Sequence, residues 1–248
     1  MRSCRGVVYQ GQSLVRDRPI LFSGSMVCGI LDGRKTKTRR LLNPQPFIDP
    51  NGNFCCADKA GKVWNWGQHL DGRPCTRNFV EEMGYQVGQR LWVRETVACG
   101  ACAPRTPSHW SEAFWRREQG SPANPNGLWY RADGLSPDKP ITERGRWVPS
   151  IHMPRWASRI TLEVTDVRVE RLQDITNEEA IAEGLKQVAH APAAARAMNC
   201  DWGVAGDFRY GSPISAFAAL WDSLNAVRGY AWDFNPWVAV ISFKRVAP

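Results

Sequence analysis

The sequence predicts an α+β protein that is mainly β with short helices, built around a small barrel. Segments with strand patterns recur along the chain, separated by single short helices or by long irregular stretches. No regular strand-helix-strand alternation occurs, which argues against a doubly wound sheet. The 248 residues suffice for one decorated domain, which we place at 19–248 after a basic extension over 1–18.

The first elements read as a strand, a helix and a second strand. Pro19–Phe22 has the composition of a short strand, and Met26–Leu31 carries apolar residues at helical spacing before Gly33 ends the helix. The following residues, 34–40, alternate side chains and include two β-branched threonines, which predicts an extended strand.

Two long stretches interrupt this pattern and are predicted to be irregular insertions. They cover about 43–86 and 99–149 and are rich in Pro and Gly or in prolines and aromatics. Between them, the segment Gly88–Thr96 reads as a turn glycine followed by a strand.

The second half of the chain gives the clearest strand and the clearest helix start. Arg159–Leu172 alternates apolar and polar residues, with a bend expected near Thr165 or Asp166. Thr176 and Glu179 then form a capping-box pattern for a helix that ends at Gly184.

The last two elements are a helix and a buried strand. Phe217–Leu224 repeats apolar residues at helical spacing, and Trp237–Arg245 closes the chain as the strand. The Ala-rich segment before them, 187–211, gives no clear pattern.

Positive charge is concentrated at the start of the chain. The net charge is +8, and residues 1–40 hold nine Lys and Arg against Asp17 and Asp32. A concentrated positive field favours polyanions, so RNA or single-stranded nucleic acid is the leading partner class. The alternative for Arg2–Arg18 is a solvated basic tail.

Composition also bears on location and cofactors. No run of about 18 apolar residues occurs, so we expect a cytoplasmic protein with no membrane partner. Eight scattered cysteines predict free thiols. Cys99 and Cys102 have the spacing of half a zinc site, but a second such pair is missing, so no metal or other cofactor is expected. The oligomeric state is left open.

The ordered motifs together resemble the ASCH family, compact β-barrels similar to the RNA-binding PUA domains. The resemblance covers about half of the chain, with long loops like those of ASCH proteins from bacteriophages and prophages. The pieces that carry it are Gly33–Arg40 with its preceding helix, Gly88–Thr96, Ile160–Leu172 running into Ile175–Gly184, and Trp237–Phe243.

This resemblance implies a site and a reaction. Small bacterial members are N(4)-acetylcytidine amidohydrolases that use a lysine, a threonine and a glutamate. Those residues correspond here to Lys35, Thr38 and Glu183, with a nearby arginine at Arg40. Other ASCH proteins are linked to RNA cleavage or to RNA binding without chemistry, so a ribonuclease and a non-catalytic binding module are the alternatives.

Amide hydrolysis needs a nucleophile, a base and an acid for the departing amine. Lys35 could activate the Thr38 hydroxyl if burial and neighbouring cations lower its pKa, and Glu183 could protonate the amine or position a water. The alternative is structural: Thr38 is a strand residue, and Lys35 with Glu183 is an ion pair.

The position of Glu183 supports its pairing with Lys35. It directly precedes the glycine that ends its helix, where the helix dipole disfavours a negative charge by up to about 1 kcal/mol. A compensating cation is therefore expected, and Lys35 is the candidate.

Six further residues are candidates for binding the ligand. The basic side chains could hold phosphates, and an aromatic and an arginine on a strand could stack on a base. Core packing explains the tryptophan equally well. These residues are Arg34, Lys37, Arg39, Arg40, Trp92 and Arg94.

Overall fold

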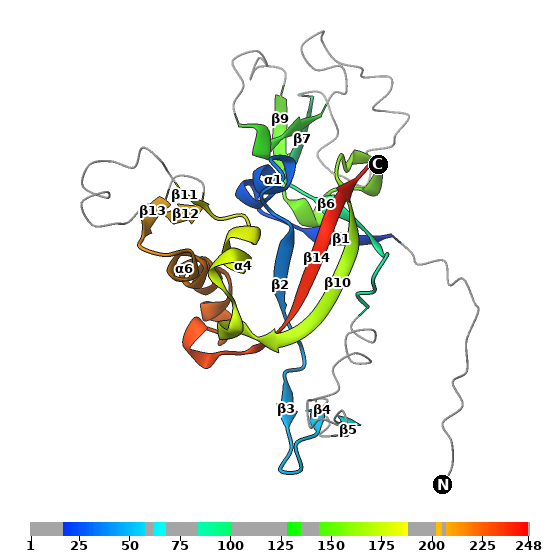
Figure 1. The fold of residues 1–248 in the computed structure, drawn as a ribbon. Helices are drawn as coiled ribbons and strands as arrows, with labels where there is room; N and C mark the ends of the chain where they lie inside the picture. The colour runs from blue at the N-terminus through cyan, green and yellow to red at the C-terminus, as the bar shows by residue number, and fades with distance from the viewer. Residues whose placement is uncertain are drawn as a thin grey trace.

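Five strands form the central sheet of the computed structural model, in the order β1-β6-β10-β14-β2 (Figure 1). The structure describes residues 17–57, 62–67, 84–100, 128–134, 144–187, 202–204 and 207–247. Within them the protein is strand-rich with short helices, which confirms the α+β prediction in outline. The strands of the sheet are β1 (Arg18–Leu21), β6 (Arg90–Arg94), β10 (Thr161–Arg171), β14 (Trp237–Val246) and β2 (Lys37–Leu41).

The predicted barrel is not closed within the described residues. β1 and β2 are the two edges of the sheet, and no backbone ladder joins them. Strand β1 has four residues, and two residues separate its end from the start of helix α1 (Gly24–Leu31). One side chain spans the gap, because Arg40 Nη2 donates to the carbonyl oxygen of Leu21 at 2.7 Å.

Strand β14 is buried on both faces, so the sheet has a core on each side. Ile241 and Phe243 pack with α1 and with residues of β6 and β10. Val238 and Val240 pack with residues of α4 (Asn177–Ala182) and α6 (Pro213–Asn225). Figure 1 shows these two helices next to each other, beside the sheet.

The basic segment does not form one continuous strand. Strand β2 begins only at Lys37, and the preceding residues connect α1 to α4 instead. The backbone N–H of Lys35 donates to the Gly29 carbonyl, and that of Thr36 donates to the Ala182 carbonyl, both at 2.9 Å. The prediction of a strand over 34–40 was therefore wrong for its first three residues, because these hydrogen bonds hold them between two helices.

The long strand β10 confirms the expected bend. Its pairing with β14 shifts register between Val164 and Asp166, so Thr165 is the additional residue of a bulge. Strand β10 pairs antiparallel with β14 and β6, while β1 pairs parallel with β6.

Both predicted insertions contain small sheets, so calling them irregular was wrong where they are described. The first holds β3 (Pro46–Ile48), β4 (Phe54–Ala57) and β5 (Val63–Gly67), and Phe54 packs edge-on against Trp237 at 5.5 Å. These strands are only three to five residues long and lie between turns rich in Pro and Gly, so the sequence shows no clear strand pattern there.

The second insertion and the Ala-rich segment contribute the other small sheets. β7 (Val97–Gly100) pairs with β8 (Trp129–Tyr130) and β9 (Arg144–Val148). β11 (Lys186–Gln187), β12 (Trp202–Val204) and β13 (Asp207–Tyr210) form the third sheet. Short 3-10 helices occupy Arg131–Asp133, Ser150–His152, Arg155–Ala157, Leu172–Asp174, Ala226–Arg228 (η7) and Trp232–Phe234.

Within the described ranges, no helix combines the length and apolar character needed to span a bilayer.

Half of the predicted capping box is present at α4. The Thr176 hydroxyl accepts a hydrogen bond from the backbone N–H of Glu179 at 3.3 Å. The Glu179 carboxylate binds three basic side chains instead of returning to the cap.

We predict that Thr176→Ala lowers the free energy of unfolding by about 1 kcal/mol, because it removes the N-cap acceptor. Thr176→Ser keeps the acceptor and should stay near the wild type. Urea unfolding followed by circular dichroism measures both variants. Equal stability of the Ala and Ser variants would show that the cap contributes nothing.

Candidate functional site

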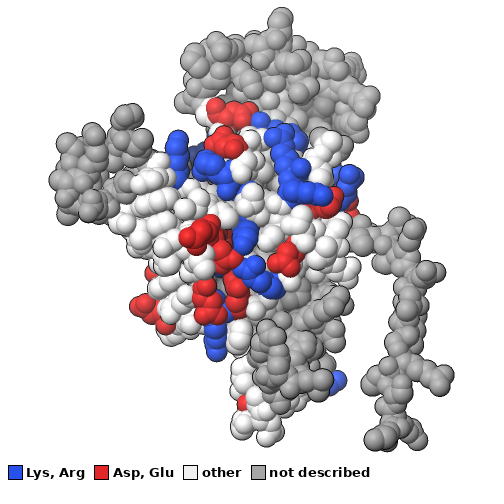
Figure 2. All heavy atoms as spheres, in the orientation of Figure 1, with Lys and Arg blue, Asp and Glu red and all other residues white. Residues whose placement is uncertain are grey.

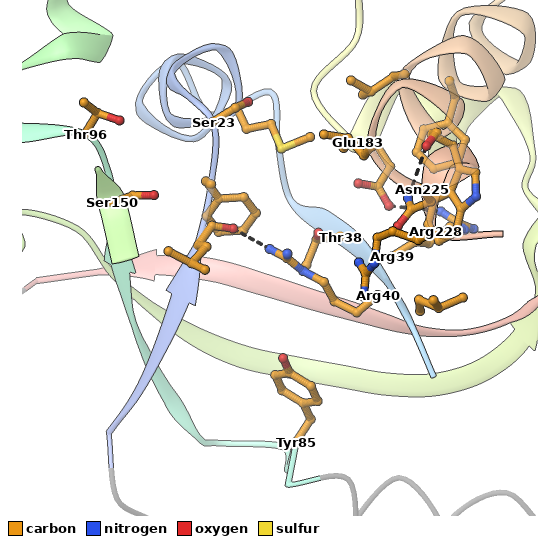
Figure 3. Close-up of a pocket in the computed structure, with 18 residues that line it drawn as sticks. Ser23, Thr38, Arg39, Arg40, Tyr85, Thr96, Ser150, Glu183, Asn225 and Arg228 are labelled. Atoms are coloured by element: carbon orange, nitrogen blue, oxygen red, sulfur yellow. Dashed lines mark hydrogen bonds and ion pairs between the residues drawn. The ribbon is translucent and has the colours of Figure 1, made fainter. Parts of the chain in front are cut away.

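A cavity of about 600 Å³ lies where the two edges of the sheet approach each other (Figure 3). Its wall comes from the end of β1, the start of α1, strand β2, the C-terminal half of α6, and η7. The polar residues that line it are Ser23, Thr38, Arg39, Arg40, Tyr85, Thr96, Ser150, Glu183, Asn225 and Arg228.

Lys35 and Glu183, predicted to be partners, form a buried ion pair. Lys35 Nζ lies 2.8 Å from Glu183 Oε2, and the side chains are 0% and 4% exposed. Nζ also donates to the backbone carbonyls of Glu183 at 2.7 Å and Lys37 at 2.9 Å. Three acceptors match the three N–H groups of an ammonium ion. Burial lowers the pKa of Lys35, and the charge and hydrogen bond of Glu183 oppose that shift.

Two glycines make room for the stem of Lys35. A Cβ at Gly29 would lie 3.3 Å from the Lys35 Cβ, and one at Gly184 would lie 3.2 Å from it. Gly184 also has a φ of +98°, which side-chain-bearing residues rarely adopt. The glycine predicted to end the helix therefore also allows Lys35 to reach the helix end.

Thr38 and Glu183 both line the cavity, whereas Lys35 does not. Thr38 is 3% exposed and, like Glu183, belongs to the cavity wall, while Lys35 does not. Figure 3 shows Thr38 and Arg40 on β2, with the Glu183 carboxylate on the same wall. Of the three predicted catalytic residues, two could therefore touch a ligand directly.

A second ionic network covers the outer side of this pair. Arg39, whose side chain is 0% exposed, contacts Glu170 at 2.9 Å, Glu179, and Glu183 at 3.5 Å. Glu179 also binds Lys37 at 2.8 Å and Arg168. Burial alone would raise the pKa of Glu179, but hydrogen bonds from Lys37, Arg168 and Arg39 lower it to about 2.

The basic segment is therefore mostly neutralised within the protein. Arg34 pairs with Asp32 at 2.8 Å and donates to the Gly184 carbonyl, and Lys37 and Arg39 are held by glutamates. Figure 2 shows acidic and basic side chains intermixed on the face in view. Three of the predicted phosphate-binding side chains, those of Arg34, Lys37 and Arg39, are therefore already paired with carboxylates of the protein. The stretch Met1–Arg16 lies outside the described residues.

Arg40 differs from the other cations of the segment. It lines the cavity, and its guanidinium lies 5.1 Å from the centre of the Phe22 ring. Burial lowers its pKa, while Tyr85 and Glu183 oppose the shift. Within the described residues it forms no ion pair with a carboxylate.

Trp92 and Arg94, predicted to bind the ligand, do not line the cavity. Trp92 is 7% exposed, and the guanidinium groups of Arg94 and Arg155 lie 4.6 and 5.8 Å from its ring centre. Both arginines therefore compete with any base for the ring. This leaves Trp92 as a packing residue, as the alternative interpretation had it.

The sequence did not identify the α6 side of the cavity. Phe217, Trp221, Asn225 and Arg228 all line it. The spacing of Phe217 and Trp221 predicted a core-facing helix, and both are buried. A helical pattern does not distinguish a core contact from a cavity wall, so no signal in the sequence marks these residues as functional.

The predicted half of a zinc site falls on Cys99 and Cys102. The Cys99 side chain and Cys102 lie outside the described residues. Elsewhere in the described ranges, no three potential ligands gather in a group. Cys28, Cys55 and Cys56 are free thiols, as expected.

No family model matches the chain, and neither do any curated proteins or solved structures.

We predict that Gly184→Ala destabilises the protein by more than Gly33→Ala does. Both glycines have positive φ, but a Cβ at Gly33 would meet nothing within 4 Å, whereas one at Gly184 would press on Lys35. Gly33→Ala should lower the free energy of unfolding by about 1 kcal/mol through backbone strain alone. The additional loss in Gly184→Ala measures the contact of the new Cβ with Lys35. Equal losses in urea unfolding would contradict close packing of the lysine stem.

We also predict a loss of stability in acid that depends on Glu179. Its pKa is lowered from 4.5 to about 2, so its contribution is present above pH 4.5 and is lost as the pH falls towards 2. Glu179→Gln should lower stability at pH 7 and remove part of the acid dependence. Denaturant titrations at several pH values test this. Parallel pH curves for the wild type and the variant would refute the assignment.

Proposed function

We propose that the cavity binds a cytidine derivative and that the protein hydrolyses the amide of an N(4)-acylated cytidine. The observation that carries the proposal is the placement of the Thr38 hydroxyl and the Glu183 carboxylate on one cavity wall, with Lys35 fixed behind the carboxylate. The order of the motifs that resemble the ASCH family supports this. We also propose that the sheet has a PUA-like arrangement, in which β1 and β2 approach each other across the cavity.

The cavity suits a nucleoside in size and lining. Its volume of about 600 Å³ lies within the range of about 300–1,000 Å³ that is usual for small-molecule sites. The aromatic side chains of Phe22, Tyr85, Phe217 and Trp221 line it beside polar groups. Aromatic faces stack on bases, and the polar groups can read the edges of the base.

In the proposed reaction, Thr38 acts as the nucleophile and Glu183 as the base. The Thr38 hydroxyl attacks the acyl carbon while Glu183 takes its proton, and the C–N bond breaks as the proton passes to the departing nitrogen. Water then hydrolyses the acyl-threonine ester, which releases a carboxylic acid and restores Thr38. The other product is cytidine with a free amino group.

Lys35 acts in this proposal as a positioning residue rather than as the base. Its Nζ is surrounded by three hydrogen-bond acceptors, which suits the ammonium form, and an ammonium has no lone pair to accept a proton. Instead it fixes one oxygen of Glu183 while Arg39 lies 3.5 Å from the other.

Binding of RNA or single-stranded nucleic acid without chemistry is the second candidate. It is supported by Arg40 and the exposed Arg228, which place positive charge on the cavity wall. Its signature would be affinity that falls steeply with salt in the absence of turnover. Cleavage of RNA by the wild type would instead indicate a ribonuclease.

We predict turnover of N(4)-acetylcytidine by the wild type and a loss of at least about 100-fold in kcat/KM for Thr38→Val and Glu183→Gln. Thr36→Val is the matched control, because Thr36 is exposed in the same motif and should leave kcat/KM within about twofold. Cytidine release followed by chromatography is the measurement. Absence of turnover on any acylated cytidine, or full activity of Thr38→Val, would overturn the proposal.

A further inference from the structure

Arg40 is a cavity cation that the described carboxylates leave without an ion pair. Lys35, Lys37 and Arg39 each lie within 3.5 Å of a glutamate oxygen. Among the described residues, the one hydrogen bond of Arg40 is the contact of Nη2 with the Leu21 carbonyl. Its Nε is buried and has no partner within that part of the chain.

Arg40 is half-buried and, among the described residues, has no ion-pair partner. The guanidinium lies over the Phe22 ring, and burial lowers its pKa. Burying a charged group without a paired partner is costly, and the planar guanidinium presents several donors in a fixed fork. Such a fork matches the oxygens of a phosphate, which it can bind through two hydrogen bonds at once.

The position of Arg40 places this binding capacity beside the proposed reacting groups. Figure 3 shows Arg40 extending from β2 towards β1, next to Thr38. Arg228, from η7, lines the same cavity and is exposed, so it adds positive charge at the solvent side. A ligand with an anionic end would therefore be held at the gap between the two edge strands.

We propose that Arg40 binds the phosphate of a cytidine nucleotide, so that the ligand of this cavity is a nucleotide unit rather than a free nucleoside. This inference rests on the proposed function for the identity of the base. The phosphate belongs either to a free nucleotide or to a unit of an RNA chain, and both present the same oxygens to the guanidinium.

Isothermal titration calorimetry with non-acylated probes tests the proposal without requiring turnover. We expect cytidine monophosphate to bind the wild type at least about tenfold more tightly than cytidine. Arg40→Gln should reduce the affinity for the monophosphate to that for cytidine, and Arg40→Lys should keep part of the difference. A short cytidine-containing RNA is the third probe. Tighter binding of the RNA than of the monophosphate identifies a chain phosphate, and the reverse identifies a free nucleotide.

Two controls separate this contact from general electrostatics and from misfolding. Arg245→Gln removes the same charge from an exposed position of β14 and should leave the preference for the monophosphate unchanged. In the wild type, raising the salt concentration should weaken monophosphate binding more than cytidine binding. This salt test needs no variant and therefore remains valid if Arg40→Gln does not fold.

Equal affinity of the wild type for cytidine and both phosphorylated probes would overturn the inference, as would an equal loss in Arg40→Gln and Arg245→Gln. The outcome is distinguishable from that of the proposed reaction. An Arg40-dependent phosphate preference without hydrolysis of acetylcytidine would leave this inference standing and remove the reaction. Hydrolysis of acetylcytidine without a phosphate preference would support the proposed reaction and overturn this inference.

Discussion

The buried ion pair between Lys35 and Glu183 is the interaction on which the arrangement of the cavity depends. An unpaired ammonium in a site that is 0% exposed would cost several kcal/mol, so Lys35 can occupy its position only while Glu183 accompanies it. Glu183 in turn stands at the end of α4, where the helix dipole disfavours a carboxylate. Each charge therefore compensates for an unfavourable property of the other's position. Their contact joins the segment before β2 to the end of α4.

The ionic contacts form two layers with different consequences. The inner pair is enclosed and sets the orientation of Glu183 at the cavity, while the outer network around Glu179 neutralises Lys37, Arg39 and Arg168. The sheet contributes by leaving β1 and β2 unpaired at its edges, which keeps the cavity open. Arg40 spans this gap and, among the described residues, makes one hydrogen bond and no ion pair. Net charge alone would have suggested a broad polyanion surface, whereas in the described part of the chain Lys37, Arg39 and Arg168 are paired with glutamates.

The sequence predicted the features that local patterns determine. The bend near Thr165 and the cap at Thr176 were predicted because bulges and caps leave signatures within a few residues. The partnership of Lys35 with Glu183 was predicted from the family resemblance and from the position of Glu183 at a helix end, and the ion pair confirms it. The edges of the sheet and the α6 wall of the cavity were not. Both depend on how distant segments meet, and a residue such as Trp221 has the same helical spacing whether it faces a core or a cavity. The glutamates that neutralise Lys37 and Arg39 were missed for the same reason, since they lie on β10 and α4.

A double-mutant cycle between Lys35 and Glu183 measures how far the two charges depend on each other. Urea unfolding of Lys35→Met, Glu183→Leu and the double variant gives the coupling free energy of the pair. We predict that each single variant is strongly destabilised, that the double variant is less destabilised than the sum of the two, and that the coupling free energy is at least about 2 kcal/mol. Effects that add within about 0.5 kcal/mol would contradict it, because the two charges would then not depend on each other.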